Sequence, residues 1–185
     1  MKPITAPVLL FALALALVQG CATKNIISEG GDNVMLKGHD PVAYFAVGRP
    51  VPGRPEIKAT HEDVTYYFSS DANRQEFMQR PEKYAPRFGG FCANGIVYGI
   101  PWGGEPDAWQ IIDGELYIFG SQNAKKYFLM DEERNLQLAD RYWDTEMKTM
   151  SSAFAQRVKR LIARVPHYKT GDELKAEWQA RQAKN

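Results

Sequence analysis

An apolar run near the N-terminus does most to limit what this chain can fold into, because it separates a leader from the folding domain. Lys2 gives the leader a positive start, the run covers residues 8–18, and the small residue Gly20 precedes Cys21. This order is typical of a secretory signal. The run of about eleven residues is too short for a membrane-spanning helix, which needs about 20. Residues 1–20 are therefore predicted to be a signal that is removed on export.

The residues around the expected cleavage site, Leu-Val-Gln-Gly at 17–20 followed by Cys21, resemble the lipobox of bacterial lipoproteins. The resemblance implies acylation of Cys21 with fatty acids such as palmitate. Several acyl chains anchor a protein stably, whereas one chain binds only marginally. Because Ala22 is not acidic, the expected location is the outer membrane of a bacterial envelope, facing the periplasm. The alternative is an ordinary signal peptide that leaves Cys21 unmodified.

The cysteine count and the net charge restrict the chemistry further. Cys92 is the only cysteine besides Cys21, so a domain anchored through Cys21 has no internal disulfide. A lone thiol in an oxidising compartment is buried, bound to a ligand, paired with another molecule, or reactive. The chain has a formal net charge of +1. This near-neutral balance lacks the basic excess that phosphate binding needs, so no nucleic-acid partner is expected.

Turn and capping signals predict an α+β domain over residues 34–145, with a small antiparallel sheet and packed helices. Residues 57–61 and 64–68 fit the two strands of a hairpin. Asp113 and Gly114 stand between two further apolar stretches and are a strong signal for a second hairpin. Helix caps are predicted at Ser70 and Ser121.

Two segments lie outside this domain. Residues 21–33 are polar and include Gly30 and Gly31, so they are predicted to be a flexible tether behind the lipidated cysteine. Residues 146–185 are predicted to be an amphipathic helical extension. Its first helix has an apolar stripe at Phe154, Val158, Leu161, Ile162 and Val165, and basic residues at Arg157, Lys159, Arg160 and Arg164.

The basic C-terminal extension has two interpretations, which the sequence leaves open. In one, its helices pack back on the domain and their charged faces meet solvent. In the other, they contact an anionic membrane surface or an envelope protein partner.

Several motifs follow one another between residues 34 and 143. Residues 37–44 read Lys-Gly-His-Asp-Pro-Val-Ala-Tyr, residues 66–70 read Tyr-Tyr-Phe-Ser-Ser, and residues 88–93 read Phe-Gly-Gly-Phe-Cys-Ala. Together they resemble the YHS domain family, in a branch of exported bacterial lipoproteins. Further matching residues are Asn73, Phe77, Pro81, Lys83, Tyr84, Pro106, Asp107, Ala108, Trp109, Gly114, Leu116 and Tyr117.

The resemblance does not extend to a soft-metal site. In YHS modules fused to heavy-metal transporting ATPases, it implies cysteines that bind soft cations. The matching positions in this chain hold Ala43, Ser69 and Asn73. Because thiolates select copper(I) or zinc, this branch lacks the metal-associated set.

Five residues stay as candidates for a ligand site: His39, Asp40, Tyr44, Tyr67 and Cys92. If the loop with Cys92 folds against the 37–44 motif, His39 and Cys92 would offer nitrogen and sulfur to a transition-metal ion, or form an activated thiol. The alternative is structural. In that case Asp40 caps a helix, His39 is a turn residue and Cys92 is a small buried hydrophobe.

Three functions are compatible with these features. The first is a noncatalytic envelope module that binds a metal ion or small ligand near His39 and Cys92. The second is an accessory lipoprotein whose basic C-terminal helices bind a protein partner or the membrane. The third is an enzyme that uses the Cys92 thiol. The sequence contains no Ser/His/Asp triad, phosphate loop or nucleotide fingerprint, which favours a function without catalysis.

Overall fold

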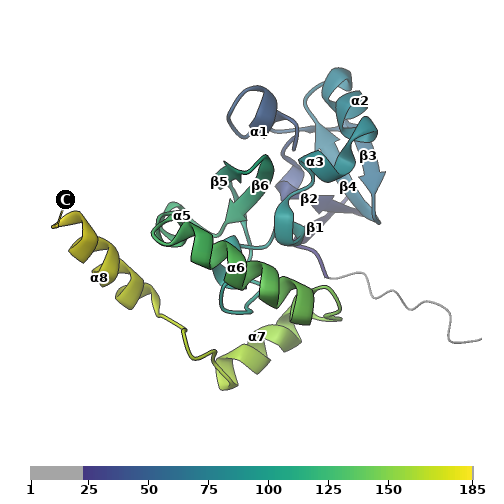
Figure 1. The fold of residues 1–185 in the computed structure, drawn as a ribbon. Coiled ribbons are helices and arrows are strands. Elements are labelled where there is room, and N and C mark those ends of the chain that lie inside the picture. Colours follow the sequence, from purple (N-terminus) through teal and green to yellow (C-terminus); the bar gives the residue numbers. More distant parts are fainter. Residues whose placement is uncertain (1–22, 185) are drawn as a thin grey trace, which may run out of the picture.

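Four short strands form a mixed sheet in the computed structural model, which describes residues 23–184 (Figure 1). The strand order is β1-β2-β4-β3, in which β1–β2 and β3–β4 are antiparallel and β2–β4 is parallel. A second sheet is the antiparallel hairpin β5–β6. The predicted α+β class is confirmed. The sheet was predicted to be antiparallel, and its β2–β4 pair is parallel instead. The strands are β1 Ile26–Glu29, β2 Asp32–Met35, β3 Arg54–His61, β4 Val64–Phe68, β5 Glu105–Ile112 and β6 Glu115–Phe119.

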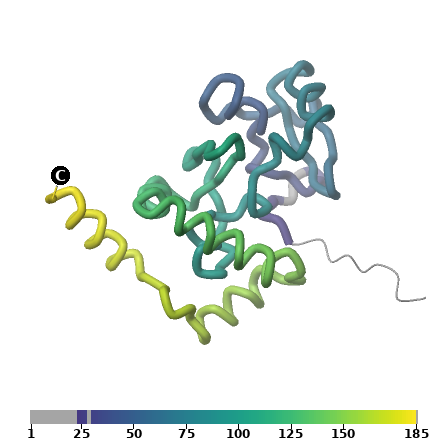
Figure 2. Tube along the Cα trace, in the orientation of Figure 1, coloured from purple at the N-terminus to yellow at the C-terminus, as the bar shows by residue number. Residues whose placement is uncertain are grey.

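Helices cover these sheets and form the C-terminal part of the chain. Figure 2 follows the chain from the sheet in purple and blue, through green helices, to yellow α8. The helices are α1 Ala43–Ala46, α2 Asp71–Gln79, α3 Pro81–Tyr84, α4 Ala93–Ile96, α5 Gln122–Leu129, α6 Glu132–Tyr142, α7 Ala153–Ile162 and α8 Gly171–Gln182, with shorter turns η1 Leu36–Gly38, η2 Arg87–Gly90 and η3 Trp143–Met147. Within residues 23–184, no helix has the length and apolar character needed to cross a membrane.

Local capping signals confirm two predicted helix starts. The Ser70 side chain accepts a hydrogen bond from the backbone N–H of Asn73 at 3.1 Å, at the start of α2. Ser121 accepts one from the N–H of Ala124 at 3.1 Å, at the start of α5. Each bond satisfies an N–H that has no partner within its own helix.

Both predicted hairpins are present, and their turns have the backbone that such short connections need. Glu62 and Asp63 join β3 to β4 with φ of 48° and 60°, and Asp113 and Gly114 join β5 to β6 with φ of 51° and 81°. Positive φ at both central residues matches the twist of the strands that flank a two-residue turn.

The N-terminal segment differs from its prediction as a flexible tether. Strands β1 and β2 form a hairpin there, and Gly30 and Gly31 are its turn, with φ of 56° and 88°. The backbone N–H of Asn25 donates to the carbonyl of Gly89 at 2.8 Å, so this segment is bound to the domain. A glycine pair is common to linkers and tight turns, and composition alone does not separate the two. Cys21 and the predicted signal lie outside the described residues.

Strand β6 separates two parts of the hydrophobic core. Successive side chains of a strand point to opposite faces. Leu116 and Ile118 pack with the mixed sheet, α1 and α2, whereas Tyr117 and Phe119 pack with α4, α5 and α6. All four side chains are buried, so β6 connects the N-terminal sheet to the helical half of the protein.

We expect Gly53→Ala to destabilise the fold by about 1–3 kcal/mol, because it overpacks a filled position. A Cβ at residue 53 would lie 2.5 Å from the carbonyl carbon of Tyr67, a backbone atom that cannot rotate away. Gly103→Ala is the matched control, since the nearest atom to its Cβ is Oδ1 of Asn25 at 3.7 Å. Urea denaturation measures both. Equal free energies of unfolding for the two variants would contradict this packing.

Candidate functional site

The carboxylate of Asp40 is fully buried and makes four hydrogen bonds. Its Oδ1 accepts from the backbone N–H of Val42 at 2.9 Å. Its Oδ2 accepts from the Ser69 N–H at 2.8 Å, the Ser69 hydroxyl at 2.6 Å and the Asn73 amide at 2.7 Å. One side chain therefore joins the start of α1, the end of β4 and the first turn of α2.

These contacts change the roles expected for the polar residues of the motif. Asp40 accepts a hydrogen bond from Val42, the residue directly before α1, which is close to its predicted role as a cap. Ser69 and Asn73 occupy positions that match metal-associated cysteines, and here both donate to the buried carboxylate. The cap of α2 is the hydroxyl of Ser70, as predicted.

His39 and Tyr44 both make contacts within the fold. Nδ1 of the half-buried His39 lies 3.0 Å from the carbonyl oxygen of Leu36. The hydroxyl of Tyr44 donates to the carbonyl of Pro106 at 3.2 Å, and its ring meets Trp109 edge-on. Burial raises the pKa of the Tyr44 phenol well above its ordinary value, so it stays protonated.

Tyr67 lies on β4 and is buried beneath two glycines. Its ring lies 3.3 Å from where a Cβ of Gly38 would be, and its backbone lies against Gly53. The side chain is 4% exposed. Its ring packs into the interior and presents little surface to a ligand.

Cys92 is a small buried residue at the start of α4. Its side chain is 2% exposed, and its backbone N–H donates to the carbonyl of Trp102 at 2.9 Å. Burial raises the pKa of the thiol, against the opposite effect of backbone N–H groups of Gly120, Gly95 and Asn94. A protonated and covered thiol is a poor nucleophile and a poor metal ligand.

The two predicted metal ligands, His39 and Cys92, have different neighbours in the fold. Among residues 23–184, no group of three or more His, Cys, Asp or Glu side chains could hold a metal ion. Within this part of the chain, His39 contacts Leu36 and pairs with Pro52, whereas Cys92 packs in the core beside α4 and β6. The two residues therefore have separate structural partners.

Helix α7 contacts the domain through polar side chains. Gln156 is 8% exposed, and its amide donates to the carbonyl of Gly99 at 3.1 Å and to Glu146 at 2.8 Å. Arg157 donates through Nε to the carbonyl of Pro101 at 2.9 Å. Arg160 forms an ion pair with the same Glu146. The inward side of this helix is thus its polar side.

The apolar side of α7 faces outward. Phe154 is 74%, Leu161 70% and Ile162 82% exposed, and Val158 is 40% exposed. Of the predicted apolar stripe, Val165 is buried, but it lies after the helix has ended. The apolar side borders a groove of about 340 Å³, lined in part by Ile100, Trp102, Phe154, Val158, Leu161 and Tyr168.

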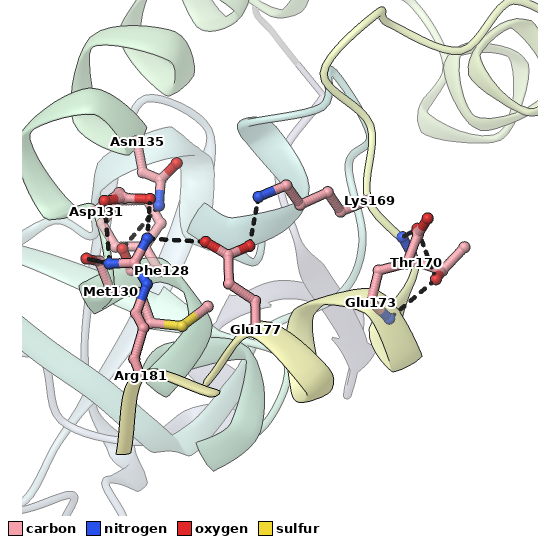
Figure 3. Close-up of polar contacts among 9 residues, drawn as sticks. All are labelled: Phe128, Met130, Asp131, Asn135, Lys169, Thr170, Glu173, Glu177 and Arg181. Carbon is pink, nitrogen blue, oxygen red and sulfur yellow. Dashed lines mark hydrogen bonds and ion pairs between the residues drawn. The ribbon is translucent and has the colours of Figure 1, made fainter. Parts of the chain in front are cut away.

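The last helix, α8, is fastened to the domain by charged groups (Figure 3). Arg181 binds Asp131 and Glu177, each at 2.8 Å, and donates to the carbonyl of Met130 at 2.7 Å. Lys169 forms an ion pair with the same Glu177. These contacts hold the segment before α8 beside α4 and α5, where a second hollow of about 220 Å³ lies.

Comparisons with protein-family models, with curated proteins and with solved structures find no match to this chain. The resemblance to the YHS family therefore stays a prediction. The function has to be inferred from the chemistry of the surfaces described above.

Sequence reasoning missed Asn94 and the direction in which α7 faces. Asn94 is buried in α4, although the surrounding glycine-rich stretch suggests a loop. For α7, the stripe of apolar residues predicts an amphipathic helix but not the side that contacts the domain. Gln156 and Arg157 face the domain, but nothing in the sequence around them distinguishes them from the polar residues of α7 that face solvent.

We expect Asp40→Asn to lower the free energy of unfolding by about 2–4 kcal/mol, because an amide NH₂ would face groups that donate to the carboxylate. The matched control is Asp63→Asn, at an exposed turn position with φ of 60° that asparagine tolerates. Its effect should stay within about 0.5 kcal/mol. Denaturant titrations measure both, and a stable Asp40→Asn variant would show that the buried network is dispensable.

We also expect the Cys92 thiol to resist reagents such as Ellman's reagent while the chain is folded, because its side chain is covered and protonated. The test uses residues 21–185 with Cys21→Ala, so that Cys92 is the one thiol present. Its labelling rate should rise only as denaturant unfolds the protein. Fast labelling in native buffer would restore the thiol-enzyme hypothesis.

Proposed function

We propose that the protein is a noncatalytic, lipid-anchored protein of the bacterial envelope whose helix α7 lies on an anionic membrane surface. The observation that supports this most is the outward apolar side of α7. A helix that only covered the domain would bury Phe154, Leu161 and Ile162 and expose its polar residues, which is the reverse of what is found.

The apolar side of α7 gives a substantial driving force for binding. Full burial of a large apolar side chain is worth about 1.5–3 kcal/mol. Phe154, Leu161 and Ile162 project from one short helix next to the half-exposed Trp102. Apolar residues gathered in this way, with a polar rim, mark interaction surfaces.

The charge around α7 favours anionic lipid as the binding partner. Residues 148–165 contain Lys148, Arg157, Lys159, Arg160 and Arg164 and no acidic residue. A basic residue close to an anionic membrane contributes about 1 kcal/mol to binding. Lys159 and Arg160 contribute less, because Glu146 already pairs with both. Amphipathic helices with apolar and basic residues are suited to the boundary between headgroups and acyl chains.

The N-terminal end of the described chain lies next to α7. The hydroxyl of Thr23 donates to the carbonyl of Met150 at 3.3 Å, and α7 begins at Ala153. Cys21 is two residues before Thr23, a distance that the chain spans with at most about 7 Å. Lipid on Cys21 would therefore attach the chain close to α7. Two attachments on one surface bind more tightly than either alone.

We expect the mature chain with Cys21→Ala to bind vesicles that contain phosphatidylglycerol, and to bind pure phosphatidylcholine vesicles much more weakly. The double variant Leu161→Ser, Ile162→Ser should weaken that binding on the order of tenfold or more, since both side chains lose their apolar contacts. Cosedimentation measures the bound fraction. Both residues are exposed, so the fold should be unaffected.

The matched control is Val47→Ser, Met78→Ser, which removes two exposed apolar side chains far from α7 in the sequence. This control should bind vesicles as the unchanged protein does. If the unchanged chain ignores anionic vesicles, or if both double variants bind equally, membrane docking by α7 is wrong and a protein partner becomes the better explanation of the exposed side.

A further inference from the structure

The side-chain amide of Asn94 in α4 has polar atoms that reach solvent, although most of the residue is covered. Asn94 is 6% exposed, and within residues 23–184 its side chain makes no hydrogen bond. It lines the hollow of about 220 Å³ between α4, α5 and the start of α8. Because these polar atoms are open and make no hydrogen bond to the described residues, they are available to a ligand in this hollow. Tyr98 also lines it, is 5% exposed, and has a hydroxyl without a hydrogen bond in the same part of the chain.

Aromatic rings make up much of the remaining wall. Tyr98 and Tyr168 meet edge to face with centroids 5.2 Å apart, and Trp102 and Tyr127 lie on the same hollow. Rings of this kind bind the apolar C–H face of a sugar, while amide and hydroxyl groups bind its hydroxyls. Pockets for drug-sized ligands measure about 300–1,000 Å³, so this smaller hollow suits a single ring.

The charges at the hollow favour a neutral ligand. Among the described residues that line it, the charged one is Lys169, and it forms an ion pair with Glu177 (Figure 3). Helix N-termini attract anions through unpaired N–H groups. Here Ser121 accepts from the N–H of Ala124, and Thr170 accepts from that of Glu173, so part of this capacity is already used.

We propose that this hollow binds a neutral carbohydrate ring, with Asn94 and Tyr98 bonding its hydroxyls and Trp102, Tyr127 and Tyr168 packing against its faces. The segment before α8 forms one wall, held in place by Arg181 and its carboxylate partners. Trp102 and Tyr168 also line the groove beside α7, whereas Asn94, Tyr98 and Tyr127 do not, so substitution of Asn94 tests this site without changing the outward side of α7.

The experiment uses the mature chain with Cys21→Ala and four probes: glucose, N-acetylglucosamine, benzoate and inorganic phosphate. Nuclear magnetic resonance titration should show saturable shifts of the Asn94 side-chain amide with at least one sugar. Asn94→Ala should weaken sugar binding at least tenfold. Its melting temperature should not fall, because the amide makes no hydrogen bond to another described residue. The matched control, Asn33→Ala at an exposed position of β2, should bind the sugar as the unchanged protein does.

Several results would overturn the proposal. No saturation with either sugar, or equal sugar binding by Asn94→Ala, would exclude the site. Tighter binding of benzoate or phosphate than of either sugar would reject the carbohydrate class. A clear fall in the melting temperature of Asn94→Ala would show that the amide supports the fold and is not reserved for a ligand.

Discussion

The buried carboxylate of Asp40 is the interaction on which the N-terminal half of the structure depends. A buried charge is tolerated only where it is fully hydrogen-bonded. Asp40 meets this condition with donors from the start of α1, the end of β4 and the first turn of α2. The side chains of Ser69 and Asn73 therefore serve the fold, because both donate hydrogen bonds to this carboxylate. The same three elements pack against Leu116 and Ile118 of β6, whose opposite face belongs to the helical half.

The features that could be predicted from sequence are local ones. Asp113 and Gly114 specify a turn, and Ser70 a helix start, through bonds to residues within a few positions. The parallel pairing of β2 with β4 and the turn at Gly30 and Gly31 depend on contacts distant in sequence, so composition suggested a tether instead. The sequence identified the candidate site residues by the chemistry of their side chains. It did not show which of them are buried, and burial determines whether they can bind a ligand. Asp40, Tyr44, Tyr67 and Cys92 lie inside the protein. The sequence predicted the apolar stripe of α7 but not the side that it faces, and the residues around the hollow carried no motif.

Two surfaces carry the binding functions that we propose. The outward side of α7 is apolar, basic at its margins and close to the chain that leads to Cys21. The hollow beside α4 is aromatic and uncharged apart from the paired Lys169. Because the polar contacts of Gln156 and Arg157 hold α7 with its apolar side away from the domain, membrane docking needs no rearrangement of the fold.

The central claim is that α7 faces lipid, and the depth of residue 161 in a membrane tests it most directly. A nitroxide attached to Leu161→Cys in residues 21–185 with Cys21→Ala reports its surroundings by electron paramagnetic resonance, while the buried Cys92 stays unlabelled. On vesicles that contain phosphatidylglycerol, the account predicts that the label is accessible to oxygen and protected from an aqueous nickel reagent. A label that stays as accessible to nickel as in the vesicle-free protein would contradict it.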